Sequence, residues 1–508
     1  MGLIDLIRGR CAKAHARLQT LTVTKHVQVT DMTGRWTRRD WLQQAACGFG
    51  SLALAGLCSE AQAAESKPSP TTFRNPLAAK TPHHEPRAKR VIFIFMQGGP
   101  SQVDTFDPKD RLVRDNGKTL KFYNSRRRQV QDQKLMASPW GFRQYGECGR
   151  WVSDLFPHVA QHVDDLCVIR SMHTEGVAHG PATLFLHTGA MNFIRPSVGA
   201  WVTYGLGTEN ENLPGFVTIN PPPTKGGPRN YANAFLPAAF QGTAIGRPGT
   251  PMQRANIRHI TNDRWTLPEQ QSQLELLQQL NQSQVAAREA EHDDELAAVI
   301  SSYELAFRMQ TNAPGVMDLS RETAATLAMY GIEEPETDEF GRQCLLARRF
   351  AEAGVRYIQI NYSDTSATPR WDQHSNIGRH AQHALATDKP VAGLLADLKA
   401  RGLLEDTLVW WGGEFGRTPF TQGNDGRDHN PAGFTIWLAG GGTKPGIAYG
   451  ETDEFGAAAV ENKVHMHDLH ATILHALGLD HTRLTYRYAG REFRLTDVHG
   501  RVVEDIFA

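Results

Sequence analysis

The chain has 508 residues, which is enough for one large α/β domain with insertions or for two domains. Lys and Arg together number 54, Asp and Glu also number 54, and the formal net charge is therefore zero. This balance argues against a nucleic-acid-binding protein, because such proteins carry a basic patch or stripe.

Residues 1–63 have the pattern of an export leader. Thr37–Leu42 (TRRDWL) precedes an apolar stretch at 45–57 and an Ala61-Gln62-Ala63 cleavage site, and Met32 is an alternative translation start. Paired arginines before a short apolar stretch are typical of a twin-arginine signal. About 13 apolar residues are too few to cross a bilayer. We therefore expect export by the twin-arginine translocase to the periplasm or the extracellular space, with no transmembrane span.

The next segment, 64–90, is rich in proline, lysine and alanine, which predicts a flexible linker or a strap over the surface. The folded domain is expected to occupy 91–508. It opens on Val91–Met96, a continuous apolar run typical of a strand that is buried on both faces. Further strands of this type are predicted at Leu166–Ile169, Phe216–Ile219, Tyr357–Ile360, Leu408–Trp411 and Phe434–Leu438.

Helical patterns alternate with these strands. Ala392–Leu404 and Asp468–Leu477 carry apolar residues at helical spacing, with Gly402 and Gly478 marking their ends. This alternation predicts an α/β fold with a mostly parallel sheet and helices on both faces. From about 265 to 331 the chain is rich in Gln, Glu, Ala and Leu, which predicts a helical insertion that serves as a packing layer or as a lid.

Acidic and imidazole side chains gather beside the predicted strands. Asp372 and His374 follow one strand, Glu414 directly follows another, and Asp428 and His429 precede a third. Such groups are ligands for divalent ions. In an open α/β sheet, ligands bind outside the carboxyl ends of the strands. The pattern predicts a shared divalent metal site, for zinc first because of the histidines, with manganese, magnesium or calcium as alternatives.

Other residues are candidates for catalysis. Arg417 and Arg427 could hold an anionic substrate group, although a Glu414–Arg417 ion pair explains the first of them equally well. Ser101 is a candidate nucleophile or anion-binding hydroxyl, and Asp104 is a further candidate metal ligand. Both residues would also suit a helix cap.

His179 and Thr183 lie at the predicted start of a helix. A helix N-terminus favours anions, so either side chain could face the site and take part in catalysis. His179 is also a further candidate metal ligand.

Ordered motifs run through the chain at Gly98–Ser101, Asp104–Lys109, Leu345–Arg356, Trp371–His374, Gly413–Pro419 and Gly426–His429. With these motifs, the chain from Val91 onward resembles the bacterial family catalogued as domain of unknown function 1501 (DUF1501). The resemblance implies an alkaline phosphatase-like core, of the superfamily that includes the sulfatases. Secreted members of the family commonly carry a twin-arginine leader.

The resemblance also implies roles. Glu414 takes the place of the metal-binding aspartate of sulfatases, and His429 falls near the later histidine ligand of phosphatases. The segment His179–Gly189 is similar to the sulfatase nucleophile segment, but a histidine stands where the formylglycine precursor belongs, and Thr183 replaces an arginine. Gln97 stands where the first strand should offer an aspartate. We therefore expect a sulfatase-like fold, but not the formylglycine-dependent reaction of sulfatases.

These observations together predict an exported metal-dependent hydrolase-like protein of the sulfatase/phosphatase type. Its substrate would be a small-molecule or polysaccharide ester of sulfate or phosphate. The alternative is a catalytically inactive exported carbohydrate- or anion-binding protein on the same fold, which the missing formylglycine precursor favours. A cell-surface structural protein is a third hypothesis, and it predicts neither metal nor small-molecule binding.

Overall fold

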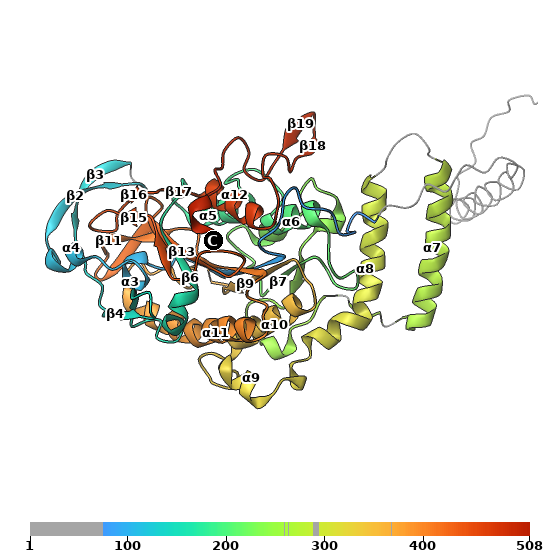
Figure 1. Cartoon of the computed structure of the whole chain (residues 1–508), viewed down its shortest axis with the longest axis horizontal. Coiled ribbons are helices and arrows are strands. Elements are labelled where there is room, and N and C mark those ends of the chain that lie inside the picture. Colours follow the sequence, from blue (N-terminus) through green and yellow to red (C-terminus); the bar gives the residue numbers. More distant parts are fainter. Residues whose placement is uncertain (1–74, 127, 259, 263, 288–293, 367) are drawn as a thin grey trace, which may run out of the picture. The chain divides into compact units, whose positions relative to one another are not determined.

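A computed structural model describes residues 75–126, 128–258, 260–262, 264–287, 294–366 and 368–508 (Figure 1). The predicted leader at 1–63 and the first part of the predicted linker lie outside the described residues.

The core is a sheet with the strand order β14-β6-β13-β10-β1-β9-β7-β8, and β17 pairs with β6. β1 runs parallel to β9 and β10, whereas β13 is antiparallel to β10 and β6. The mostly parallel α/β sheet is thereby confirmed. Its strands are β1 (Arg90–Met96), β6 (Leu166–His173), β7 (Phe216–Ile219), β8 (Thr243–Ile245), β9 (Tyr357–Tyr362), β10 (Thr407–Gly412), β13 (Phe434–Ala439), β14 (Ile447–Tyr449) and β17 (Val464–His465).

The central strands are buried along their whole length. In β1, Ile94 lies between Ile360 of β9 and Trp411 of β10, and every residue of these three strands is buried. A strand covered on both faces needs apolar side chains on both. This requirement explains the continuous apolar runs of β1 and β10, whereas β9 also buries Gln359 and Asn361, which hydrogen-bond each other.

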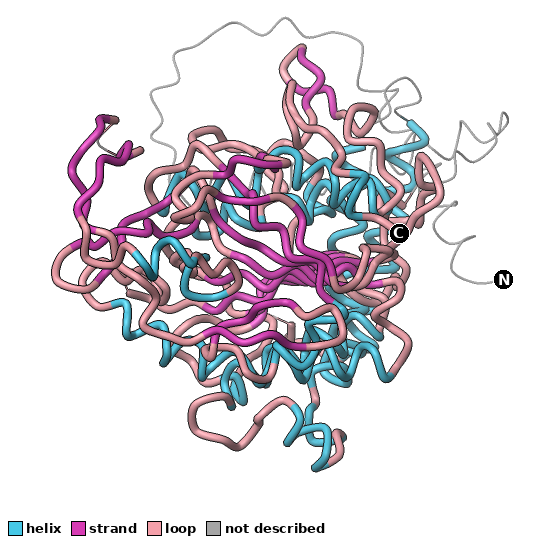
Figure 2. Tube along the Cα trace, turned by 60° about the vertical axis from the view of Figure 1, so that its left-hand side comes forward, coloured by secondary structure: helices cyan, strands magenta, loops and turns pink. Residues whose placement is uncertain are grey.

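Helices lie on both sides of the sheet (Figure 2). One side carries α10 (Asp338–Glu352) and α11 (His380–Ala400), and the other carries α5 (His179–Thr188), α6 (Val198–Leu206) and α12 (Met466–Ala476). The predicted helix Asp468–Leu477 corresponds to α12. The predicted helix Ala392–Leu404 is only the second half of α11, which starts earlier and ends before Gly402.

The segment from about 265 to 331 contains α7 (Leu267–Ala287), α8 (Asp294–Met317) and α9 (Ala324–Met329). α7 and α8 lie side by side (Figure 1). Leu305, Met309 and Ala313 of α8 are buried in the main core. α8 therefore packs on the sheet domain as a layer.

Short helices and two-stranded ribbons lie outside the main sheet. The small helices are α3 (Gln102–Thr105) and α4 (Asp110–Arg114). Two-stranded ribbons are formed by β2 (Thr119–Asn124) with β3 (Gln129–Lys134), β4 (Phe142–Tyr145) with β5 (Arg150–Ser153), β11 (Gly416–Gln422) with β12 (Gly426–Asn430), β15 (Glu451–Thr452) with β16 (Ala459–Glu461), and β18 (Tyr486–Tyr488) with β19 (Arg491–Phe493).

Residues 75–89, which we call the strap, run along the ends of two helices. The N–H of Lys80 donates to Leu206 O at 2.9 Å, and the N–H of His83 donates to Gly478 O at 2.8 Å. The N–H of Arg87 donates to Ala476 O at 2.8 Å. The strap thus satisfies carbonyls at the C-terminal ends of α6 and α12, which the helices themselves leave without partners.

Acid is expected to destabilise the fold through His470. This ring of α12 is fully buried, its Nε2–H donates to Leu186 O at 2.8 Å, and burial lowers its pKa from 6.5 to about 4. Between these two values the unfolded chain binds a proton that the folded chain does not, so stability is full above pH 6.5 and falls toward pH 4. The loss from this group is on the order of 3 kcal/mol.

Urea unfolding at pH 7.5 and pH 5 would measure this effect. His470→Gln should have a smaller pH dependence than the parent protein. An unchanged pH dependence in His470→Gln would contradict the assignment.

Candidate metal centre

The candidate site lies at the carboxyl ends of the central parallel strands. The loop after β1 carries Gly98, the chain beyond β9 carries Asp372, and the loop after β10 carries Glu414. Parallel strands bring these loops to one edge of the sheet. A Cβ on Gly98, which has φ +113°, would lie 2.7 Å from Trp371 N and 2.8 Å from Asp372 N. Glycine is therefore required for this close approach.

One group of metal-ligand type forms there among the described residues. It consists of His179, Asp372, His374 and His429, each of which offers one donor atom within 4.8 Å of the others. Asp372 Oδ1 lies at its centre, 3.1 Å from His179 Nε2, 2.8 Å from His374 Nε2 and 3.3 Å from His429 Nε2. We call these four residues the cluster. The structure thus brings together four residues predicted as ligands from distant parts of the sequence.

The second nitrogen of each ring lies next to an oxygen that can accept its hydrogen. His179 Nδ1 lies 2.5 Å from Glu414 Oε1, and His429 Nδ1 lies 2.9 Å from the carbonyl oxygen of Val177. His374 Nδ1 contacts the side-chain oxygen of Gln422 when that amide is oriented as in the structure. A neutral imidazole that donates from Nδ1 carries its lone pair on Nε2. In that tautomer each ring would present an Nε2 lone pair on the side of Asp372 Oδ1, which is the form that binds a metal ion.

This arrangement suits a cation. His374 Nε2 and His429 Nε2 are only 3.0 Å apart, and His179 Nε2 lies on the same carboxylate oxygen as they do. Facing lone pairs repel one another unless a proton or a metal ion lies between them. Ligating histidines almost always donate their other N–H to an oxygen, as these three rings do.

The charges of the cluster are strongly perturbed. Burial disfavours ionisation of Asp372, but its contacts with the three histidines and Arg417 hold its pKa far below the usual range. Burial also opposes a proton on His179, but Asp372 and Glu414 outweigh it and raise the pKa of this ring. Burial lowers the pKa of His429 to about 4. A proton on His179 and a metal ion would therefore compete for the same nitrogen.

Glu414 and Asp428, both predicted as ligands, lie beside the cluster and are not members of it. The carboxylate of Glu414 is fully buried, and both of its oxygens lie 3.1 Å from Gly98 N while one accepts from His179. Asp428 Oδ1 accepts the backbone N–H of His429 at 2.9 Å and lies 3.8 Å from His374 Nδ1. Both carboxylates are placed to orient histidines of the cluster. His429 and Asp428 belong to β12, although the sequence predicted a loop there.

Asp104, the further predicted ligand, faces Arg427 instead of the cluster. Arg427 Nε lies 2.7 Å from Asp104 Oδ2 and Nη2 lies 3.0 Å from Oδ1, and both side chains have no exposed surface. Ser101 Oγ donates to the same carboxylate at 2.5 Å. This buried group joins α3 to β12, and Nη1 of Arg427 donates to Met136 O and Thr418 O.

Arg417 is also fully buried. Its Nη2 lies 2.9 Å from Asp372 Oδ1, and its Nε donates to Gly99 O at 3.0 Å. Arg417 and Arg427 are thus not exposed to an incoming anion, which the sequence did not reveal. Arg417 instead orients the central carboxylate of the cluster.

Neither predicted hydroxyl is accessible. Ser101 and Thr183 have no exposed surface, and Thr183 Oγ1 lies inside α5 without a hydrogen-bond partner in the described structure. Sequence reasoning missed Gln422 and the carbonyl of Val177, which orient two of the rings. Gln422 gave a weak signal as a polar residue near the candidate ligands, whereas a backbone carbonyl gives none.

The model of the family described as "Protein of unknown function (DUF1501)" matches residues 88–507. The chain belongs to this family. A comparison with curated proteins gave no match.

Several solved structures resemble this DUF1501 chain weakly. The lipoteichoic acid synthase LtaP from Listeria monocytogenes has 8% identity and a TM-score of 0.34, with 84% of this chain and 80% of that chain covered. The PsFucS1 sulfatase from Pseudoalteromonas sp. has 11% identity and a TM-score of 0.29, with coverage of 77% and 68%. The alkaline phosphatase from the Antarctic bacterium TAB5 has 12% identity and a TM-score of 0.30, with coverage of 74% and 96%. Similarity at this level assigns no function to this chain.

No helix within the described residues combines the length and the apolar character needed to cross a membrane.

Proposed function

We propose that this protein is an exported metal-dependent hydrolase of sulfate or phosphate esters. The observation that carries the proposal is the convergence of three Nε2 atoms on Asp372 Oδ1, with each Nδ1 facing an oxygen. Three histidines and one carboxylate form a donor set that suits zinc first, with manganese, magnesium or calcium as alternatives.

The cluster would hold the ion, and the surrounding residues would fix its ligands. Glu414 orients His179, Gln422 orients His374, and Arg417 orients Asp372. A bound divalent ion polarises an ester oxygen and makes water a stronger nucleophile at neutral pH. Because Ser101 and Thr183 are fully buried, we propose direct attack by water, without a covalent intermediate on the protein.

Export remains part of the proposal and rests on the pattern of Thr37–Leu42. Cell fractionation in the presence and absence of a working twin-arginine translocase would test it.

The hydrolase proposal is tested on metal-loaded protein with a panel of aryl and sugar monoesters of phosphate and sulfate. His374→Ala removes one ligand from a partly exposed position and should reduce turnover by at least about 100-fold. His158→Ala, at an exposed position of the same chain, should retain full turnover. Equal activity in the parent protein and His374→Ala would contradict the proposal.

A second candidate is an anion- or carbohydrate-binding protein that binds metal but does not turn over esters. The observation in its favour is that His179 replaces the formylglycine precursor while Ser101 and Thr183 are inaccessible. Metal and ester binding without turnover across the whole panel would support this candidate over the hydrolase.

A further inference from the structure

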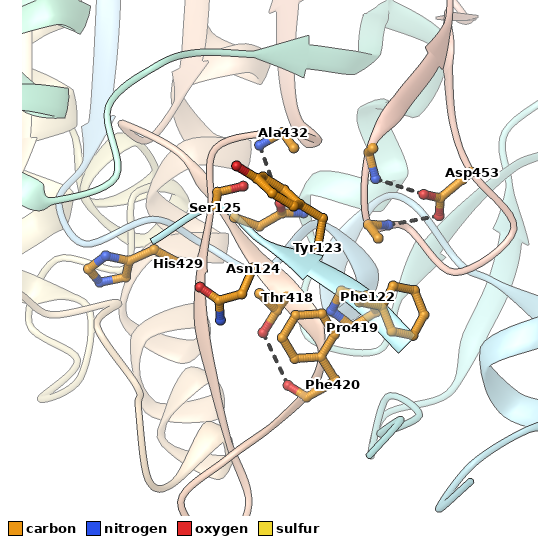
Figure 3. Close-up of a pocket in the computed structure, with 13 residues that line it drawn as sticks. Phe122, Tyr123, Asn124, Ser125, Thr418, Pro419, Phe420, His429, Ala432 and Asp453 are labelled. Atoms are coloured by element: carbon orange, nitrogen blue, oxygen red, sulfur yellow. Dashed lines mark hydrogen bonds between the residues drawn. The ribbon is translucent and has the colours of Figure 1, made fainter. Parts of the chain in front are cut away.

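A small pocket opens beside the cluster (Figure 3). It has a volume of about 230 Å³, and its walls come from β2 with the turn that follows it, from β11 and β12, and from residues 453–458. His429 lies at one side of the pocket and Asp453 at the other (Figure 3). A group that binds here would therefore contact a histidine of the cluster.

The lining of the pocket suits an uncharged ring. Tyr123 and Phe420 supply aromatic surface, and Ser125 supplies a hydroxyl group, whereas the hydroxyl of Thr418 already donates to Phe420 O and accepts the N–H of Asp428. The carboxylate of Asp453 already accepts the backbone N–H groups of Ala457 and Ala458 at 2.9 Å, so it is not directed at a ligand. Aromatic faces with a few polar groups are typical of small-molecule sites, and this volume admits about one ring.

The turn that forms one wall also carries an accessible positive charge. Arg126 directly follows Ser125, its side chain is 56% exposed, and its Nη1 lies 3.7 Å from Asp428 Oδ1. That carboxylate lies 3.8 Å from His374 Nδ1, so Arg126 stands at the rim of the cluster. At 3.7 Å and with the guanidinium exposed to solvent, this ion pair is weak. The guanidinium of Arg126 can therefore exchange Asp428 for a substrate anion, which the buried Arg417 cannot do.

We propose that the β2–β3 ribbon is the substrate-recognition element of this site, an inference that rests on the proposed function. Arg126 binds the tetrahedral oxyanion of the ester, and the pocket beside Tyr123 holds its esterified alcohol. The substrate class is accordingly a sulfate or phosphate monoester whose alcohol is a single uncharged ring.

Binding of inorganic phosphate and inorganic sulfate to the zinc-loaded protein, measured by calorimetry, tests the role of Arg126 without requiring turnover. Arg126→Gln should weaken binding of the preferred anion by about 10- to 100-fold, because a charge-assisted hydrogen bond is lost. Arg128→Gln is the matched control, since it removes the same charge from an exposed position in the same turn, and it should change the affinity by less than about threefold. Equal losses in the two variants, or no anion binding by the parent protein, would overturn the assignment of Arg126.

Phenyl phosphate and phenyl sulfate test the pocket. Tyr123→Ala, at a position with 61% exposure, should weaken binding of the phenyl ester by about tenfold and leave the affinity for the inorganic anion unchanged. Unchanged phenyl ester binding would overturn the pocket assignment. If both binding effects occur but no ester is hydrolysed, the recognition element stands and the hydrolase proposal fails.

Discussion

Replacement of Asp104 by alanine is expected to destabilise the protein by about 3–5 kcal/mol, because the guanidinium of Arg427 would remain buried without its counter-charge. Asp104 and Arg427 have no exposed surface, and two hydrogen bonds of 2.7 Å and 3.0 Å join them. Ser101 Oγ donates to the same carboxylate. Denaturant unfolding at neutral pH, followed by circular dichroism, would measure the loss.

An exposed aspartate–arginine pair serves as the control, because it shows how much of the loss in stability depends on burial of the pair. Asp154 accepts two hydrogen bonds from Arg143 at 2.9 Å and 2.8 Å, the same chemistry on an exposed surface. Asp154→Ala should therefore have a much smaller effect than Asp104→Ala. The double variant Asp104→Leu with Arg427→Met should be more stable than Asp104→Ala alone, because it leaves no charge behind. Equal destabilisation by Asp104→Ala and Asp154→Ala would show that the buried pair is not the cause.

Zinc is expected to stabilise metal-free protein by about 4 kcal/mol when free zinc exceeds its dissociation constant a thousandfold. The physical reason is that a cation relieves the repulsion between the Nε2 lone pairs of His179, His374 and His429. The shift should disappear in Asp372→Asn, which removes the central charge. Thermal unfolding with and without zinc would measure it, and chelation should reverse it.

Two further measurements of zinc affinity would show whether the ion binds at the cluster. Glu414→Gln keeps a side-chain oxygen near His179 but removes a charge, so zinc affinity should fall by about 10- to 100-fold without being abolished. Because Asp372 and Glu414 raise the pKa of His179, protons compete with zinc, and affinity should decrease as the pH is lowered. A zinc-induced shift that survives intact in Asp372→Asn would place the ion elsewhere.

The sequence predicted the sheet well because its central strands are buried on both faces. Val91–Met96 and Leu408–Trp411 are continuous apolar runs, and they pair side by side as β1 and β10. The first half of α11 was missed for the opposite reason. His380, His383 and Asp388 are buried polar residues on that helix, so the apolar period on which helix prediction relies is interrupted there.

For the candidate site, the sequence indicated which residues gather but not which way each side chain points. His374, which follows β9, and His429, on the β11–β12 ribbon that follows β10, meet because β9 and β10 end at one edge of the sheet. Whether Glu414 contacts an ion or a histidine depends on side-chain orientation, as does the burial of Arg417. The contact between His429 and the carbonyl of Val177 could not be predicted, because every residue carries the same backbone carbonyl and the sequence therefore gives no signal for it.

The strap has a consequence for how the protein is made. Its hydrogen-bond acceptors Ala476 and Gly478 lie almost four hundred residues further along the chain, so a ribosome must finish most of the polypeptide before these contacts can close. Chains interrupted before α12 would leave residues 75–89 without these partners. A protease that cuts exposed backbone would consequently distinguish interrupted translation products from finished molecules at this segment.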